Sequence, residues 1–241
     1  MTKYLKILTW NCQGAFRRKF EFVSKFDADI YIIQECENPE VSIDKNYRDW
    51  AQNFLWTGDI KHKGLGIFAR TDIMINDLKW ESNGLKHFIS CRVNDEINLV
   101  AVWTHHNNSI TFRYIGQFWK YLQINKHKMD KCIIVGDFNS NKIWDKNHRE
   151  SSHSIVVDEL ESIGIRSLYH EYYQLPQGDE PHPTLYLQRK IPKPYHIDYI
   201  FACRDLFPEI ESLEIGVHED WLSRSDHMPF VATITIASNN L

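Results

Sequence analysis

Short apolar runs of strand length recur along the whole chain, and they constrain the fold more than any other feature. They are rich in β-branched and aromatic residues, which at this length favour strands over helices. Several are apolar at nearly every position, so we expect those strands to be covered on both faces. The runs are Leu5–Trp10, Ile30–Ile33, Leu65–Ala69, Leu99–Trp103, Cys132–Val135, Ile197–Phe201 and Phe230–Ile234.

Segments between these runs have the periodicity of helices. Apolar residues recur at helical spacing over Phe16–Phe26, Phe112–His127 and Ser154–Ile163, and Gly164 follows the last of these as a typical helix stop. Strands mixed with a few helices predict an α/β or α+β sandwich. The 241 residues contain no composition shift that would mark a linker, so we expect one domain over residues 1–241.

Composition narrows the class of protein. The formal net charge of −4 lacks the basic excess that nucleic-acid-binding proteins often carry. The five cysteines are odd in number and form no C-x-x-C pair, which predicts a reduced intracellular protein without a disulfide framework or a zinc site. We find no signal-peptide pattern at residues 1–10 and no apolar stretch of membrane-spanning length. We therefore expect a cytoplasmic protein with no membrane association and no obligate protein partner.

Polar residues follow or precede the apolar runs, and they are the most informative feature for function. One such ending is an ordinary turn signal, because Asn and Asp favour turns. Acids, amides and imidazoles at several strand ends would instead form a site if the fold brings them to one rim. These residues are Asn11, Gln34-Glu35, His105-His106, Asp137-Phe138-Asn139 and Ser225-Asp226-His227.

Three of these side chains suit a hard divalent cation. Glu35, Asp226 and the amide of Asn11 offer oxygen ligands of the kind that Mg²⁺ prefers, and Mn²⁺ could substitute. Taken alone, Glu35 is equally well interpreted as a surface acid.

Other residues of the set suit acid–base chemistry. Asp137 and Asn139 are two positions apart, so in extended chain they point the same way, and one could accept a proton from water that the other orients. His227 could donate to a phosphate if a buried carboxylate holds it. Asp198 is the candidate, because an unpaired charge inside an apolar strand is costly. A plain turn at Asp137 and a structural role for Asp198 remain open from these residues alone.

Five short motifs, in order along the chain, resemble the endonuclease/exonuclease/phosphatase superfamily, which includes deoxyribonuclease I and exonuclease III. The resemblance covers essentially the whole chain, and the ordered set is far more specific than any member. The motifs are Trp10-Asn11-Cys12-Gln13-Gly14, Gln34-Glu35, Gly136-Asp137-Phe138-Asn139-Ser140, His196-Ile197-Asp198-Tyr199-Ile200 and Ser225-Asp226-His227-Met228-Pro229.

The resemblance implies a fold and a set of roles. The fold is a four-layer α-β-β-α sandwich with the site at the top of two packed sheets. Mg²⁺ is implied on Glu35, with help from Asn11 and Asp226. Asp137 is implied to activate or position the attacking water, with Asn139 in support. A His227–Asp198 pair is implied at the phosphate, and His105 takes the place of a phosphate-contacting Tyr or His.

Some departures from the family concern the substrate. Abasic-site nucleases of the family usually have Tyr-x-Pro-Asn where this chain has Thr104-His105-His106-Asn107, and they often carry a Lys shortly after the metal-binding Glu, where Cys36-Glu37-Asn38 stands here. Inositol-polyphosphate phosphatases carry Cys-Asp-Arg where this chain has Ile197-Asp198-Tyr199. Neither subgroup fits well.

Three functions are therefore compared. The first is a nuclease acting on DNA or RNA, in which Arg17, Arg18, Lys19, Arg113 and Arg149 contact phosphates. Trp144 and Trp221 would stack on bases, although core or loop packing is the alternative interpretation of both tryptophans. The second is a phosphodiesterase or phosphatase of a small nucleotide or other phosphoester, which the near-neutral pI favours slightly. The third is a non-catalytic binding module, which is disfavoured because no expected catalytic position is missing. We expect the first.

Overall fold

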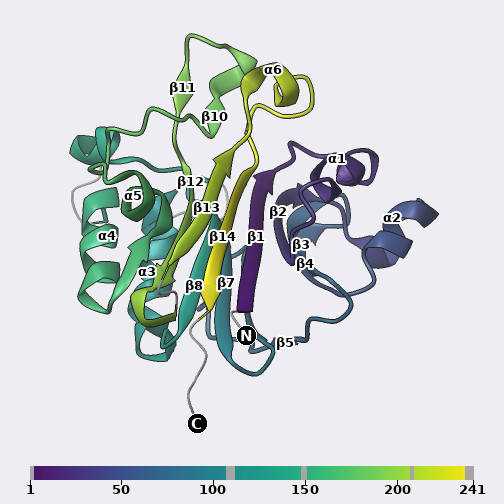
Figure 1. Cartoon of the computed structure of the whole chain (residues 1–241), viewed down its shortest axis with the longest axis horizontal. Coiled ribbons are helices and arrows are strands. Elements are labelled where there is room, and N and C mark those ends of the chain that lie inside the picture. The colour runs from purple at the N-terminus through teal and green to yellow at the C-terminus, as the bar shows by residue number, and fades with distance from the viewer. Residues whose placement is uncertain (1–2, 107–111, 148–150, 207–208, 237–241) are drawn as a thin grey trace.

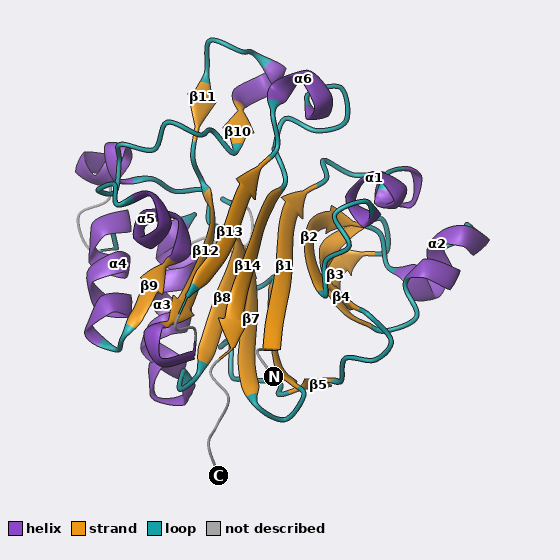
Figure 2. Ribbon diagram, in the orientation of Figure 1, coloured by secondary structure: helices purple, strands orange, loops and turns teal. Residues whose placement is uncertain are grey.

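Two six-stranded sheets pack face to face in this computed structural model, which describes residues 3–106, 112–147, 151–206 and 209–236 (Figures 1 and 2). The first sheet has the order β13 (Ile210–Ile215), β14 (Phe230–Ile236), β1 (Lys3–Asn11), β2 (Ile30–Cys36), β4 (Lys63–Ala69) and β3 (Phe54–Ile60). The second has the order β5 (Ile75–Asp77), β6 (Phe88–Val93), β7 (Ile97–Trp103), β8 (Cys132–Asp137), β12 (Asp198–Cys203) and β9 (Ile165–Ser167). A separate short pair consists of β10 (Leu185–Tyr186) and β11 (Pro194–Tyr195).

Helices flank both sheets, which confirms the predicted four-layer α-β-β-α sandwich. Two short helices, α1 (Phe20–Ser24) and α2 (Lys45–Trp50), lie outside the first sheet (Figure 2). On the other side, α3 (Ile115–Asn125), α4 (His153–Ser162) and α5 (Leu168–Tyr173) cover the second sheet, and α6 (His218–Trp221) lies near the top (Figure 2). Among the described residues, no helix is both long enough and apolar enough to cross a membrane.

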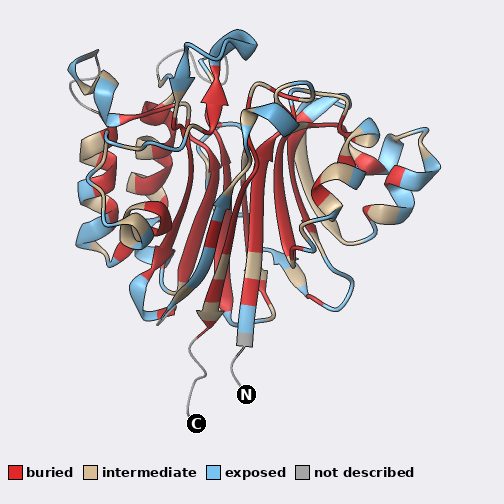
Figure 3. Ribbon diagram, turned by 45° about the horizontal axis from the view of Figure 1, so that its top comes forward, coloured by how far each residue is buried: buried red, intermediate tan, exposed pale blue. Residues whose placement is uncertain are grey.

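Alternate residues of the central strands serve two different cores. In β1, Leu5 and Ile7 belong to the large core that fills the space between the sheets. Leu8 and Trp10 point the other way, into an aromatic core with Phe16 beneath α1 and α2. The strands are buried along most of their length (Figure 3). This explains why the apolar runs are nearly continuous in the sequence.

Every predicted apolar run lies wholly or mostly within a strand. The predicted helix Phe16–Phe26, in contrast, is wrong in detail. The segment forms a 3-10 turn, η1 (Phe16–Arg18), followed by α1, with a break at Lys19. The Lys19 ammonium donates to the carbonyl oxygens of Cys12 and Arg224, at 2.6 and 2.7 Å. These tertiary hydrogen bonds accompany a non-helical conformation at Lys19, which apolar periodicity cannot signal.

Gly136 is a position where the backbone requires glycine. It has a φ of 147° in β8, and a Cβ there would stand 1.9 Å from the carbonyl oxygen of Val102 on β7. We expect Gly136→Ala to destabilise the protein by about 3 kcal/mol or more, because backbone strain adds to a backbone clash. Gly84→Ala is the matched control: its φ of 80° carries strain, but nothing lies within 4 Å of the added carbon. Chemical denaturation of both variants measures the difference, and equal losses would contradict the clash.

Candidate active site

The strand order brings the predicted residues to one edge of the sandwich. β1 and β2 run parallel, as do β7 and β8, so the carboxyl end of each pair carries its polar residues to the same rim. β12 runs antiparallel to β8, which places Asp198 directly opposite Asp137. His227 lies just before β14, whose first residue Phe230 pairs with Thr9 near the end of β1. Five separate segments therefore meet at the upper edge of Figure 1.

A β-bulge turns Glu35 toward this rim. Strand alternation places Ile32 and Gln34 on the inner face of β2 and would send Glu35 to the outer face. The pairing of β2 with β4 shifts register between Gln34 and Cys36, and Glu35 has a φ of 64°. Cys36 consequently joins the outer core, while Glu35 Oε1 lies 3.5 Å from the Asn11 amide nitrogen on the inner face. The bulge is a local conformation that re-aims one acid, as bulges beside active sites often do.

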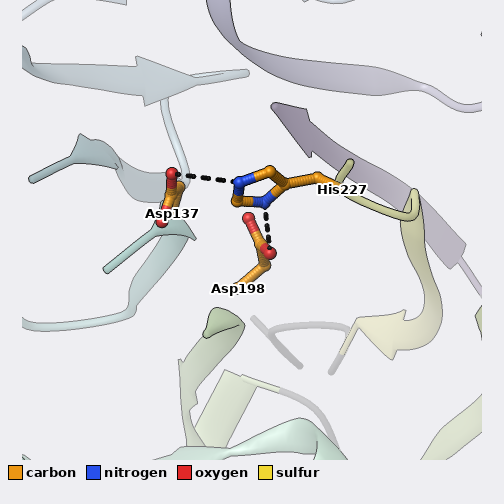
Figure 4. Close-up of side chains that lie close together, drawn as sticks. All are labelled: Asp137, Asp198 and His227. Atoms are coloured by element: carbon orange, nitrogen blue, oxygen red, sulfur yellow. Dashed lines mark hydrogen bonds and ion pairs between the residues drawn. The ribbon is translucent and has the colours of Figure 1, made fainter. Parts of the chain in front are cut away.

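His227 and Asp198 form a buried hydrogen-bonded pair, as predicted. The His227 Nδ1 lies 2.9 Å from Asp198 Oδ2 (Figure 4). The hydroxyl of Thr184 accepts hydrogen bonds from the backbone nitrogens of Ile197 and Asp198, which fixes the start of β12. The indole of Trp10 donates to the His227 carbonyl at 2.9 Å. Asp198 thus holds the imidazole through Nδ1, Trp10 fixes the backbone of His227, and Nε2 is directed toward Asp137.

Asp137 is fully buried at the end of β8 and is held by two amides. Its carboxylate accepts hydrogen bonds from Asn11 Nδ2 at 3.0 Å, from Asn139 Nδ2 at 3.0 Å and from the Asn139 backbone nitrogen at 2.9 Å. Asn139 also donates to the Thr104 carbonyl and has a φ of 46°, which Asn tolerates better than most residues. The predicted partnership of Asp137 and Asn139 therefore has a structural basis. Asp137 Oδ2 and His227 Nε2 stand 4.0 Å apart, beyond hydrogen-bond distance (Figure 4).

Burial and neighbouring charges shift the proton affinities of these groups. Burial and, to a smaller extent, the nearby Asp198 carboxylate together raise the pKa of Asp137 to about 7. Burial lowers the pKa of His227, but the carboxylates of Asp198 and Asp137 outweigh burial and the net shift is upward. The site therefore contains an acid whose pKa is close to neutrality beside an imidazole that favours its charged form. Such a pair can exchange protons with a reacting phosphate.

The residues predicted to bind a metal provide oxygen donors that fit a hard dication. Glu35 Oε2 lies 2.9 Å from the Lys63 ammonium, so this carboxylate already faces a cation. Asn11 Oδ1 accepts from the Gln13 backbone at 3.0 Å and has a second lone pair. The half-exposed carboxylate of Asp226 is close enough to contribute to the raised pKa of His227. Two carboxylates and an amide oxygen form a donor set that fits Mg²⁺.

A second group could in principle hold an ion. Asp137, Asp198 and His227 place ligand atoms within 4.8 Å of one another. The hydrogen bond between His227 Nδ1 and Asp198 Oδ2 occupies that ring nitrogen, and the other ring nitrogen, Nε2, faces Asp137 Oδ2 at 4.0 Å. We therefore interpret this cluster as acid–base machinery.

The other predicted residues lie in more varied surroundings. The Arg17 guanidinium pairs with the buried Glu37 carboxylate, so part of its charge is used within the protein. Arg18 and Arg113 are exposed. Trp144, in η4 (Lys142–Asn147), is half-buried with its ring centroid 5.1 Å from that of Tyr195.

The remaining predicted residues come after β7 in the sequence. Burial lowers the pKa of the His105 imidazole, and the positive charge of the nearby Lys63 helps to lower it further. Asn107 and Arg149 lie outside the described residues.

Lys63 is a site residue that the sequence did not reveal. The abasic-site nucleases of the family often carry a lysine shortly after the metal-binding Glu, and this chain has none there. Lys63 comes instead from β4, whose Gly64 pairs with Cys36 across the bulge. Strand register is the missing information, because it places residues far apart in the sequence side by side.

Comparison with known proteins agrees with this geometry. The family model described as Endonuclease/Exonuclease/phosphatase family matches residues 8–227. The chain belongs to this family. Its members, as the family name states, hydrolyse phosphate esters, so this endonuclease/exonuclease/phosphatase protein is a hydrolase acting on ester bonds. No curated protein matches the chain in sequence.

Solved structures of the same fold superpose on nearly the whole of this chain. A 3′-5′ exonuclease from Neisseria meningitidis is 18% identical with a TM-score of 0.68, over 95% of this chain and 98% of that one. An AP endonuclease from Archaeoglobus fulgidus is 16% identical with a TM-score of 0.71, over 95% and 98%. A humanized D. rerio TDP2 is 15% identical with a TM-score of 0.67, over 96% and 98%.

Proposed function

We propose that this protein is a Mg²⁺-dependent phosphodiesterase that cleaves DNA or RNA by direct attack of an activated water. The observation that carries the proposal is the placement of Asp137 Oδ2 4.0 Å from His227 Nε2, beside the Glu35 carboxylate and Asn11. A base and an acid face each other at a rim that also has oxygen donors for a metal. This arrangement supports in-line displacement at phosphorus.

Each residue has a distinct task in this mechanism. Glu35, with Asn11 and Asp226, would hold Mg²⁺, which when bound neutralises charge on the phosphate oxygens. Asp137 accepts a proton from the attacking water or orients that water, while Asn139 and Asn11 fix its carboxylate. His227 Nε2 donates to a phosphate oxygen, and Asp198 keeps the imidazole charged and oriented.

Nucleic acid is the substrate class that we favour. The structure of the Neisseria protein is described as bound to a product DNA hairpin, and the Archaeoglobus protein is named for abasic-site cleavage. The exposed Arg18 and Arg113 supply cations that could contact phosphates. A small phosphoester is the alternative, supported by the net charge of −4 and by the use of Arg17 in an internal ion pair.

The metal requirement tests the mechanism through Glu35. We expect wild-type protein to cleave single-stranded oligonucleotide, plasmid or RNA faster than a bis(aryl) phosphate, to lose activity in EDTA, and to regain it with Mg²⁺ or Mn²⁺. Glu35→Gln keeps the side-chain shape but removes the charge that attracts a dication. The Mg²⁺ concentration for half-maximal rate should rise at least roughly 10–100-fold, since even indirect partners of metal ligands have effects of that size.

An exposed acid provides the control for this substitution. Glu211→Gln removes the same charge from the surface of β13 and should leave the Mg²⁺ dependence unchanged. A folded Glu35→Gln protein with the wild-type Mg²⁺ dependence would show that the metal is bound elsewhere. Cleavage of the bis(aryl) phosphate alone, with every nucleic acid intact, would favour the small-phosphoester alternative.

A further inference from the structure

A small aromatic pocket opens beside the metal-binding acid and has no role in the mechanism above. Its volume is about 250 Å³, and it is lined by Asp59, Ile60, Lys63, His87, Trp103 and His105. A cavity of this size holds one flat ring system and little more. The pocket is therefore suited to one unit of a substrate.

Lys63 connects this pocket to the reaction centre. Its ammonium lies 2.9 Å from Glu35 Oε2 and 5.6 Å from the centroid of the Trp103 ring. Trp103 is also the last residue of β7 and pairs with Asp137 across the sheet. A group in the pocket would thus lie within about one nucleotide of a phosphate at the rim.

Three of the six residues that line the pocket, His87, Trp103 and His105, have aromatic rings. The centroid of Trp103 lies 4.6 Å from that of His87 and 6.1 Å from that of His105. The series continues outward to His106, whose ring centroid is 4.4 Å from that of His105. Ile60 adds an exposed apolar side chain at the opening. Rings of this kind accept a planar aromatic ligand by stacking, whatever its identity.

His87 has two features of a ligand-binding residue. Its φ of 61° lies in the left-handed region, which histidine adopts more readily than most residues other than glycine, and this conformation fixes where the ring lies. It is 7% exposed, and within the described part of the chain its Nδ1 has no hydrogen-bond partner. Leaving a buried polar atom without a partner is costly. Burial also lowers the pKa of His87 to about 4, so at neutral pH the ring has one donor and one acceptor nitrogen.

We propose that this pocket binds one unpaired nucleobase, that of a nucleotide next to the scissile phosphate, with His87 Nδ1 hydrogen-bonded to the edge of the base. The inference rests on the proposed action on nucleic acid and specifies which form is preferred. A base inside a duplex is stacked and paired, and it must leave the stack to enter a pocket. The protein should therefore prefer single strands, or duplexes in which one nucleotide is readily unpaired.

Position-specific base removal tests the pocket by binding. The protein carries Asp137→Asn to slow cleavage, and the probe is a fluorescent single-stranded DNA oligonucleotide in Mg²⁺. A series of probes lacks one base at a time through a tetrahydrofuran analogue, so the phosphate backbone is unchanged. We expect one position at which base removal raises Kd about 10-fold or more, in line with the loss of a stacked base.

His87→Gly supplies the diagnostic variant, because glycine adopts the required φ without strain. In this background, base removal at the sensitive position should change Kd less than about 2-fold. His127→Ala is the control, since His127 is exposed and lies before β8, at the opposite end of that strand from Asp137. Thermal melting of each variant confirms that the fold is retained.

Two results would overturn the inference: equal effects at all positions, or an unchanged sensitive position in His87→Gly. Failure of the proposed function is a separate outcome. A protein that binds with a sensitive position but cleaves no nucleic acid retains the pocket and loses the nuclease assignment. A protein that cleaves nucleic acid without a sensitive position retains the nuclease assignment and loses the pocket.

Discussion

Asp137→Asn is expected to lower kcat by about 10²–10⁴-fold or more while leaving KM nearly unchanged. The substitution removes the only carboxylate that two amides, Asn11 and Asn139, hold within reach of His227 Nε2 among the described residues. An asparagine amide is a poor proton acceptor, so the attacking water loses its base. In the proposed mechanism this carboxylate makes no ground-state contact with phosphate, so substrate binding should persist.

The structure also predicts a side effect of this substitution. Asp137 accepts three hydrogen bonds, and an asparagine would direct its own N–H groups at the donors of Asn11 or Asn139. A modest loss of stability should accompany the loss of activity and can be measured by thermal melting. Asp130→Asn, at an exposed position before the other end of β8, is the matched control and should change neither quantity. A folded Asp137→Asn protein with wild-type kcat would exclude Asp137 from the chemical step.

Most of the buried strands could be predicted from the sequence, whereas the edge strands and the buried strand β6 could not. Central strands such as β7 and β8 are buried on both faces and show as continuous apolar runs. Edge strands such as β3 and β13 are half-exposed, and β13 has the sequence IESLEI, in which acids interrupt the apolar residues. Pairing with β4 and β14 determines their conformation, and no local pattern reports that pairing.

The site shows the same division. Asn11, Asp137 and Asp198 are polar residues in or at the ends of apolar strands, where apolar residues are expected. Such a departure from the local pattern indicates function. Lys63 and His87 could not be predicted, because their roles depend on strand register, on a bulge and on a left-handed backbone conformation. Arg17 shows what a sequence pattern omits: a basic run suggests phosphate contact, but the ion pair of Arg17 with Glu37, twenty positions away, becomes visible only in the fold.

The second large effect is expected at the His227–Asp198 pair. His227→Ala removes the group that we propose donates to the phosphate, and it should lower kcat by about 10²–10⁴-fold. Asp198→Asn leaves the imidazole in place but removes the larger of the carboxylate charges that together outweigh burial and keep the pKa of His227 raised. Its effect on kcat should be of similar size, as in other hydrolases where a buried acid supports an imidazole. In the double variant the two losses should not multiply, because the carboxylate acts only through the ring.

The free energy of unfolding provides an independent measure of the same pair. The effect of Asp198→Asn on it should have opposite signs in the wild-type and His227→Ala backgrounds. Asp198→Asn alone breaks a buried charge pair and should destabilise the protein by about 3–5 kcal/mol. In a His227→Ala background, Asp198 is a buried carboxylate without its partner, and its Oδ1 already has no hydrogen bond among the described residues. Neutralising it there should stabilise the protein by about 1–3 kcal/mol, because an uncompensated buried charge is removed. Denaturant titration of the four proteins in the cycle measures both values. If Asp198→Asn destabilises both backgrounds equally and the two kcat losses multiply, the pair does not act as a unit, and Asp198 is a structural residue of β12 or a metal ligand.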